Sequence, residues 1–321
     1  MSDRTPKLLV RTTEVTDVTP LIRRFRFEAA DGGVLPPFSG GAHVIVEMHD
    51  GPVLRRNPYS LMSPPTDPTS YTISVRRDDA GRGGSRFMHR DVRPGTTLTI
   101  SRPVNLFPLD WRARKHLLVA GGIGITPFLA QMVQLSAADA PFELHYAVRS
   151  REQGAYVAAL EERYGRRVRV YCDDRDERIP LDEVLAGQPL GTQLYTCGPA
   201  GMMEWVLGTA RAAGWPDHAL HHERFLAPAS GVPYEITLAL SKLTIRVSEH
   251  QSMLEAIEAA GIQAPYMCRG GACGECETTV LACEGTMLHN DVFLSADERT
   301  SGTKIMPCVS RFEGTSLVLQ R

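Results

Sequence analysis

The stretch CRGGACGEC, residues 268–276, followed by Cys308, places four cysteines in the spacing C-x4-C-x2-C-x31-C. This spacing of thiolates is the one by which a single loop wraps a plant-type [2Fe-2S] cluster. Three glycines lie between the ligands and allow backbone N–H groups to approach the sulfurs without a Cβ in the way. The sequence therefore predicts a one-electron carrier held by Cys268, Cys273, Cys276 and Cys308.

A zinc site is the alternative for these cysteines. Cys273 and Cys276 form a C-x-x-C pair, and four thiolates also suit Zn²⁺. Zinc sites of this type usually pair two short C-x-x-C arms, whereas here three ligands share one loop and the fourth follows far downstream. The spacing favours the cluster over zinc. Cys283 falls outside the spacing and is interpreted as a spare thiol.

Length and charge limit the classes of protein to consider. With 321 residues, the chain is long enough for two or three domains. Its net charge of -2 argues against a nucleic-acid surface. The start MSDRTPKLLV has no apolar signal segment, and no run of about 18 apolar residues occurs, so we expect a cytoplasmic protein without a membrane partner. Seven cysteines, of which the cluster takes four, make a disulfide framework improbable.

Three regions with different sequence patterns follow one another along the chain. Residues 1–110 contain short β-rich runs separated by Gly and Pro turns, which predicts an antiparallel β-barrel. Residues 111–227 alternate strand, glycine turn and helix, which predicts a doubly wound α/β domain with a parallel sheet. A linker is expected at 227–233, and residues 234–321 read as a small α+β module with a hairpin, a helix at 252–260 and the cysteine loop. The strands expected in the first region are 23–28, 43–48, 71–76 and 97–101.

Two turns of the α/β region end strands and suit a dinucleotide. The first contains Gly121, Gly122, Gly124 and Thr126, and the second contains Cys197 and Gly198. Backbone N–H groups and a helix N-terminus at such turns can bind a pyrophosphate, and both turns belong to the same edge of the sheet. The first is an incomplete G-x-G-x-x-G, because Pro127 replaces the third glycine.

Asp173 and Asp174 follow the third strand, where the adenosine ribose of a bound dinucleotide is expected. A carboxylate there accepts hydrogen bonds from a 2'-hydroxyl and repels a 2'-phosphate, which favours NADH over NADPH. The alternative interpretations are a solvated charged turn, or a phosphate site made by Arg175 or Arg178.

The β-barrel region offers a second set of ligand-binding groups. Its candidates are Arg55, Arg56, Tyr59 and Ser60 at the end of one strand, and Arg82, Gly83, Gly84 and Ser85 in a glycine-rich turn. Together they offer cations, an aromatic ring, hydroxyls and free N–H groups, which suit a planar heterocycle with a phosphate. Each of these turns taken alone is more often a plain turn. Phe225, after Glu223 and Arg224, is either a core aromatic or a ring that covers a ligand.

Taken together, the motifs NPYS at 57–60, GRGGS at 81–85, GGIGITP at 121–127, CGP at 197–199, ERF at 223–225 and the four cysteines resemble the phthalate dioxygenase reductase family. The resemblance runs from end to end. It implies an FMN-binding barrel, an NADH-binding domain and a C-terminal β-grasp ferredoxin domain that passes electrons to a partner Rieske non-haem-iron oxygenase, bound transiently.

Carried over by position, the resemblance also implies roles for the candidates. Tyr59 and Ser60 would meet the isoalloxazine, with Ser60 near N5, and the FMN phosphate would be held by Arg55 or Arg56 with Gly83, Gly84 and Ser85. Gly122, Thr126, Cys197 and Gly198 would border the nicotinamide and pyrophosphate, and Phe225 would stack near the flavin. Ser60, Cys197 and Phe225 would shape the gap across which hydride moves.

Two departures from the family pattern and two other functions remain open. Asn57 stands where the family motif has arginine, and the segment between Cys276 and Cys308 is long for the family. A reductase for a separate ferredoxin, a cytochrome P450 or a diiron monooxygenase would use the same cofactors. A non-catalytic iron–sulfur redox sensor would need neither the flavin pocket nor the nucleotide turns.

Overall fold

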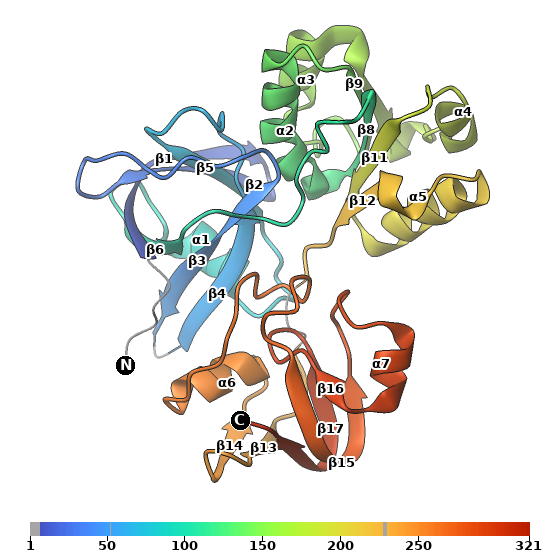
Figure 1. Cartoon of the computed structure of the whole chain (residues 1–321). Coiled ribbons are helices and arrows are strands. Elements are labelled where there is room, and N and C mark those ends of the chain that lie inside the picture. The colour runs from blue at the N-terminus through green and yellow to red at the C-terminus, as the bar shows by residue number, and fades with distance from the viewer. Residues whose placement is uncertain (1–6, 52, 227–229) are drawn as a thin grey trace.

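The computed structural model describes residues 7–51, 53–226 and 230–321 and arranges them in three parts, each built on its own sheet (Figure 1). The first three residues of the linker expected at 227–233 lie outside the described residues. Within the described residues, no helix combines the length and the apolar character needed to cross a membrane.

The first part is a curled antiparallel sheet with the strand order β4-β3-β6-β1-β2-β5, and β7 pairs with β3. Its elements are β1 (Lys7–Thr19), β2 (Ile22–Ala29), β3 (Ala42–Asp50), β4 (Val53–Ser60), β5 (Tyr71–Arg76), α1 (Gly84–Asp91), β6 (Thr97–Ser101) and β7 (Val104–Asn105). The sheet encloses a core that includes Phe25, Phe27, Tyr71 and Ile73, which are fully buried. The antiparallel flavin-type fold expected from the sequence is confirmed.

β3 is buried on both faces over its first seven residues, Ala42–Met48. Val44 and Val46 point into the core of the first part, because successive side chains alternate across a strand. His43 and Glu47 therefore face the opposite side, and both are buried there.

The second part is a parallel sheet with the strand order β10-β9-β8-β11-β12. Its strands are β8 (Lys115–Gly121), β9 (Phe142–Val148), β10 (Val168–Cys172), β11 (Thr192–Cys197) and β12 (Leu220–Glu223), and its α-helices are α2 (Thr126–Ala137), α3 (Val157–Tyr164), α4 (Leu181–Ala186) and α5 (Ala200–Ala212). Leu118 and Ala120 pack into one core, whereas Leu117 and Val119 pack into another on the opposite face of the sheet. The doubly wound architecture expected from the alternating pattern is thus confirmed.

The chain order reverses at β8, since β9 lies on one side of it and β11 on the other. In open parallel sheets, ligands bind outside the carboxyl ends of the strands at this switch point. The turn after β8 and the turn after β11 both lie there.

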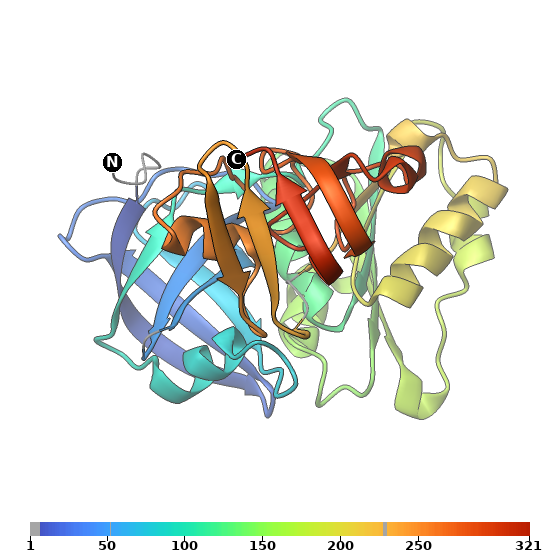
Figure 2. The ribbon, with the colours of Figure 1, turned by 90° about the horizontal axis from the view of Figure 1, so that it is seen from below.

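The third part is a mixed sheet with the order β14-β13-β17-β15-β16, in which only β13 and β17 pair in parallel. Its elements are β13 (Tyr234–Leu238), β14 (Leu243–Val247), α6 (Met253–Ala259), β15 (Thr278–Leu288), α7 (Ala296–Ser301), β16 (Lys304–Ile305) and β17 (Arg311–Leu319). Figure 1 shows α6 on the side of this part that faces β4, and Figure 2 shows the third part lying across the other two.

Three features of the fold were not expected from the sequence. The first is the long β1 at the start of the described chain. The second is α1, which begins at Gly84 inside the segment read as a turn, because Gly83 takes a left-handed conformation with φ 102° that ends the loop there. The third is α7, although its capping box of Ser295 and Glu298 is a recognisable helix start.

Candidate functional site

A cavity of about 300 Å³ lies where the three parts of the chain meet. Its walls come from the end of β4, the loop before α1, the turn after β8, the residues following β12 and the cysteine loop. The candidate residues that line it are Tyr59, Ser60, Arg82, Gly83, Gly84, Ser85, Thr126, Phe225 and Cys268. Residues that are far apart in the sequence are therefore brought to one place, and a volume of this size is typical of small-molecule sites.

The end of β4 supplies a ring and a hydroxyl to this cavity. Asn57 Nδ2 donates to the Tyr59 hydroxyl at 3.3 Å, and burial raises the pKa of Tyr59 to about 12. The Ser60 hydroxyl donates to Glu223 Oε2 at 3.4 Å, which joins β4 to β12 across the cavity.

The polar groups beside Ser60 are uncharged at neutral pH. Burial raises the pKa of Glu223 to about 8, so its carboxyl group keeps its proton. Cys197, the register partner of Glu223, is fully buried, and burial raises its pKa well above the ordinary value of a thiol. This wall of the cavity is hydrogen-bonding but neutral.

Arg55 is the arginine with N–H groups directed at the glycine loop. A Cβ placed on Gly83 would lie 3.1 Å from the guanidinium carbon of Arg55. Arg55 Nε donates to Asp50 at 3.3 Å, while its Nη1 is buried without a protein partner among the described residues. An unpartnered buried guanidinium nitrogen beside a loop of backbone N–H groups is a suitable place for a phosphate.

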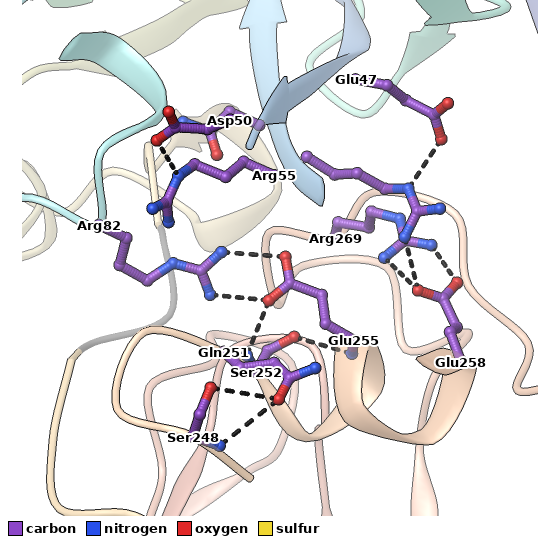
Figure 3. Close-up of polar contacts among 12 residues, drawn as sticks. Glu47, Asp50, Arg55, Arg82, Ser248, Gln251, Ser252, Glu255, Glu258 and Arg269 are labelled. Carbon is purple, nitrogen blue, oxygen red and sulfur yellow. Dashed lines mark hydrogen bonds and ion pairs between the residues drawn. The ribbon is translucent and has the colours of Figure 1, made fainter. Parts of the chain in front are cut away.

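The other two candidate arginines, Arg56 and Arg82, make ion pairs with carboxylates. Arg56 pairs with Glu47 at 2.7 Å and with Glu258 at 2.9 Å. Arg82 makes two hydrogen bonds to Glu255, of 2.9 and 3.1 Å (Figure 3). Both arginines thereby contact α6 of the third part, although Arg82 also borders the cavity.

A second cavity, of about 880 Å³, follows the carboxyl edge of the parallel sheet. The candidates that line it are Gly121, Gly122, Gly124, Gly198, Asp173 and Phe225. Phe225 borders both cavities and is 47% exposed, so its ring lies at their junction.

The two glycine turns pack directly against each other. A Cβ on Gly124 would lie 2.2 Å from the carbonyl oxygen of Cys197, and one on Gly198 would lie 3.0 Å from the Cα of Gly121. Gly122 has φ +53°, a left-handed conformation. Side chains at Gly124 and Gly198 would push the turns apart, whereas at Gly122 it is the left-handed backbone that favours glycine.

Asp173 lies in the second cavity next to a positive charge. Arg178 Nη1 contacts Asp173 Oδ1 at 2.6 Å, and both side chains are largely exposed. The carboxylate and the arginine that the sequence offered as alternatives are thus neighbours in one cavity, whereas Asp174 is not among the residues that line it.

The four cysteines of the C-x4-C-x2-C-x31-C pattern form two contacting pairs. Cys268 hydrogen-bonds with Cys273, and Cys276 with Cys308. The Gly270 N–H donates to Cys268 Sγ at 3.3 Å. Two thiolates for each of two irons is the arrangement that a [2Fe-2S] cluster needs, whereas a single zinc ion needs four ligands around one point.

Cys283, the cysteine outside the C-x4-C-x2-C-x31-C pattern, has different surroundings. Cys283 lies on β15 and packs against the core of the third part, and no side-chain contact joins it to the four.

The sequence interpretation missed several residues of the two cavities. His43 lines the first cavity, is 6% exposed, and has its Nε2 without a partner among the described residues. Arg149, Tyr171 and Trp205 line the second. The available signal for His43 was a polar residue that, like Glu47, interrupts the mainly apolar run AHVIVEM, whereas nothing local distinguishes the other three.

Comparisons with known proteins agree with this geometry. The family model described as "Dimethylamine monooxygenase subunit DmmA-like, N-terminal domain" matches residues 99–220, and the "2Fe-2S iron-sulfur cluster binding domain" matches residues 236–313. The "Heme-dependent oxidative N-demethylase beta subunit" of Ectopseudomonas mendocina is 45% identical over 97% of both chains. The "Carnitine monooxygenase reductase subunit" of Acinetobacter baumannii is 43% identical over 96% of both.

The solved structure of phthalate dioxygenase reductase superposes on the whole molecule, with a TM-score of 0.88, 33% identity and 98% coverage of both chains. The chain belongs to the phthalate dioxygenase reductase family. It is an electron-transfer oxidoreductase of the reductase-subunit type, and its third part is a [2Fe-2S] ferredoxin domain. The family resemblance noted from the sequence motifs is confirmed.

The raised pKa of Glu223 predicts a pH dependence of stability. An unfolded glutamate titrates near 4.5, so between this pH and about 8 the folded protein holds a proton that the unfolded chain has lost. Stability should therefore fall as pH rises through that window. Because the side chain keeps some access to the cavity, we expect Glu223→Gln to relieve on the order of 2 kcal/mol of this loss by pH 9.

Thermal unfolding at pH 6 and pH 9 measures the effect. Glu235→Gln, at an exposed position on β13, is the control and should follow the wild type. Identical pH dependences for the wild type and Glu223→Gln would show that Glu223 is not buried as a neutral acid.

Gly84→Val should release flavin but not iron. Its Cβ would lie 2.5 Å from Asn57 Nδ2, so either the Asn57 side chain or the loop must shift at the expected phosphate cradle. Overpacking of this kind costs about 1–3 kcal/mol, or roughly 5- to 150-fold in flavin affinity. After dialysis, absorbance measures the retained flavin and metal analysis measures the retained iron. The control is Gly208→Val on α5, where a Cβ meets no atom within 4 Å, and full flavin retention by Gly84→Val would contradict the phosphate role.

Proposed function

We propose that this chain takes electrons from NADH through FMN to its [2Fe-2S] cluster and delivers them to a Rieske non-haem-iron oxygenase component during a transient encounter. The single observation that carries the proposal is the cavity at which the flavin-type sheet, the turn after β8, the end of β12 and the cysteine loop meet. The loop residues Cys268, Gly270 and Ala272 line the same cavity as Tyr59 and Ser60.

The residues around the first cavity fit FMN. Gly83, Gly84 and Ser85 line the cavity and would hold the phosphate, with Arg55 and its unpartnered Nη1 behind the loop at Gly83 and outside the cavity lining. Arg56 is committed to Glu47 and Glu258. A bound flavin supplies the conversion between a two-electron hydride donor and a one-electron acceptor.

The side chains of the two cavities would position the flavin and the nicotinamide and shield them from water, and none has to act as a nucleophile. Ser60 offers a hydroxyl oriented by its hydrogen bond to Glu223, and that neutral carboxyl group holds a proton beside it without adding charge. Cys197 is fully buried and lines neither cavity, so it would act on the gap only through the turn after β8, against which its carbonyl oxygen packs at Gly124. Phe225 covers the junction of the two cavities and excludes water. Ser60, Cys197 and Phe225 are therefore our candidates for shaping the hydride gap.

The exit for electrons lies on the ferredoxin domain. Cys273 is the member of the four that is not fully buried, and the apolar side chains of Met267 and Phe293, which lie near it in the fold, are 39% and 45% exposed. A Cβ on Gly274 would lie 2.3 Å from Phe293, so that ring packs on the loop itself. An acceptor that binds this face comes close to the cluster ligands.

A haem-containing oxygenase is the second candidate acceptor, because the relative at 45% identity is named as a subunit of a haem-dependent N-demethylase. Purified reductase mixed with NADH and either a Rieske or a haem oxygenase component distinguishes the two. Turnover of the Rieske component supports the proposal, and turnover of the haem component alone assigns the second.

Asp173 is predicted to set nucleotide preference. Asp173→Ala removes the carboxylate that would bind a 2'-hydroxyl and repel a 2'-phosphate, so the kcat/KM ratio of NADH to NADPH should fall about tenfold. Asp174→Ala, which changes a residue outside the cavity, should leave the ratio unaltered. A constant ratio in Asp173→Ala would transfer the assignment to Arg178 or Arg149.

Cys273→Ser is predicted to separate flavin chemistry from onward transfer. The variant loses a thiolate ligand and should lose its cluster, yet the flavin and nucleotide sites belong to other sheets and should survive. NADH-dependent ferricyanide reduction should persist within about twofold, while cytochrome c reduction falls at least about tenfold.

The matched control is Cys283→Ser, which leaves all four proposed ligands in place. It should keep the cluster and both activities. Wild-type oxygenase turnover by Cys273→Ser, or loss of the cluster from Cys283→Ser, would refute the ligand assignment.

A further inference from the structure

Two carboxylates on α6 connect the cysteine loop to the flavin-type sheet. Glu255 binds Arg82 of the loop before α1, and Glu258 binds Arg56 of β4 and Arg269 of the cysteine loop. Figure 3 shows Glu255 facing Arg82, and Glu258 facing Arg269. These pairs, here called the α6 ion pairs, are the polar bridge between a domain that holds a cluster and a sheet that holds the proposed flavin site.

The pair between Glu255 and Arg82 is the more buried of the two bridges. Its side chains are 9% and 8% exposed, and the guanidinium uses Nη1 and Nη2 on the two carboxylate oxygens. Glu255 Oε2 also accepts the backbone N–H of Ser252, which completes the capping box at the start of α6. The helix end and the domain contact are thus fixed by one carboxylate.

The Glu258 bridge reaches the cysteine loop itself. Glu258 Oε2 accepts from Arg56 Nη1 at 2.9 Å and from Arg269 Nη1 at 3.1 Å. Arg269 follows the ligand Cys268 directly, has φ 50°, is 5% exposed and lies with its guanidinium carbon 3.7 Å from the centre of the Tyr266 ring. A non-glycine residue in this conformation needs its surroundings to hold it, and Glu258 and Tyr266 do so.

The partners on the flavin-type sheet belong to the elements that line the cavity. Arg56 is three residues before Tyr59 on β4, and Arg82 directly precedes Gly83 in the glycine loop. A movement of α6 would therefore move the cysteine loop relative to the cavity wall. Buried ion pairs are costly to break singly, because the remaining partner is left as an unpaired charge.

We propose that Glu255 and Glu258 are positioning residues for electron transfer, which hold the cysteine loop at the flavin cavity through Arg82, Arg56 and Arg269. The inference rests on the proposed function, in which two electrons from NADH leave the flavin one at a time and each reduces one oxidised cluster. According to this inference, the α6 ion pairs affect electron transfer from the flavin to the cluster. They do not affect hydride transfer to the flavin.

The test uses the holoprotein with Glu255→Gln, Glu258→Gln and the double variant. Glutamine keeps the shape of each side chain, and at position 255 it still completes a capping box, so the variants remove the charge while α6 keeps its N-terminal cap. Anaerobic mixing with NADH, followed by absorbance, measures flavin bleaching and then cluster reduction. We expect flavin bleaching within about twofold of the wild type and cluster reduction slowed about tenfold or more in the double variant.

Three further measurements separate positioning from damage. Flavin and iron content should stay stoichiometric, the EPR spectrum of the dithionite-reduced cluster should match the wild type, and the KM for NADH should not change. Glu235→Gln removes the same charge from an exposed position of the same domain and should behave as the wild type. If the double variant loses iron, the rates of cluster reduction in the two single variants are compared with the wild-type rate instead.

Cluster reduction at the wild-type rate in iron-replete double or single variants would overturn the positioning role while leaving the proposed function intact. A wild-type protein that bleaches its flavin with NADH but never reduces its cluster would instead refute the proposed function, and the positioning role with it.

Discussion

The buried pairing of Glu255 with Arg82 holds the ferredoxin domain against the flavin-type sheet, and the position of the cysteine loop at the first cavity depends on it. Domains joined by a short linker move relative to one another by default, unless their interface is large and apolar. Here a polar contact fixes them: the side chains of this pair are about as buried as core residues, and removing one partner of such a pair typically costs about 3–5 kcal/mol. Glu258 adds a second bridge, directly to the cysteine loop.

This constraint explains how one cavity can belong to three sheets. The flavin-type sheet contributes Tyr59 and Ser60, the parallel sheet contributes Thr126 and the residues at the end of β12, and the ferredoxin domain contributes Cys268. Phe225 lies at the junction with the second cavity, where the nucleotide turns begin. The order of the sites in space is the order in which electrons are expected to move, and no residue has to supply acid or base chemistry.

The fold was largely predictable because its signals are local. The alternation of strand, glycine turn and helix predicted the parallel sheet, and the hairpin with helix 252–260 predicted the ferredoxin domain, whose α6 indeed spans Met253–Ala259 with Ser252 as its cap. The helix at Gly84 was missed, because the glycine-rich stretch before it suggests a turn. The cysteine spacing predicts the ligand set, and the structure adds the pairing of the thiols two and two.

The roles of the arginines could not be read from the sequence. Arg55, Arg56 and Arg82 are equally suitable as phosphate ligands until Glu258 and Glu255, about 200 residues away, are seen to bind two of them. Contacts of this kind depend on how domains dock, and spacing along the chain carries no information about docking. His43 was missed for a related reason, since a histidine in an apolar strand acquires meaning only when its nitrogen is found to be buried without a partner.

The central claim, that one chain links a two-electron donor to a one-electron cluster through a flavin, is tested most directly by anaerobic titration of the purified protein with NADH, monitored by absorbance and EPR. A flavin that takes two electrons and a cluster that takes one require about 1.5 equivalents of NADH per protein, with flavin bleaching and the signal of a reduced [2Fe-2S] cluster reached in the same titration. A protein that consumes one equivalent and shows no reduced-cluster signal, or that contains zinc in place of two irons, would contradict the account.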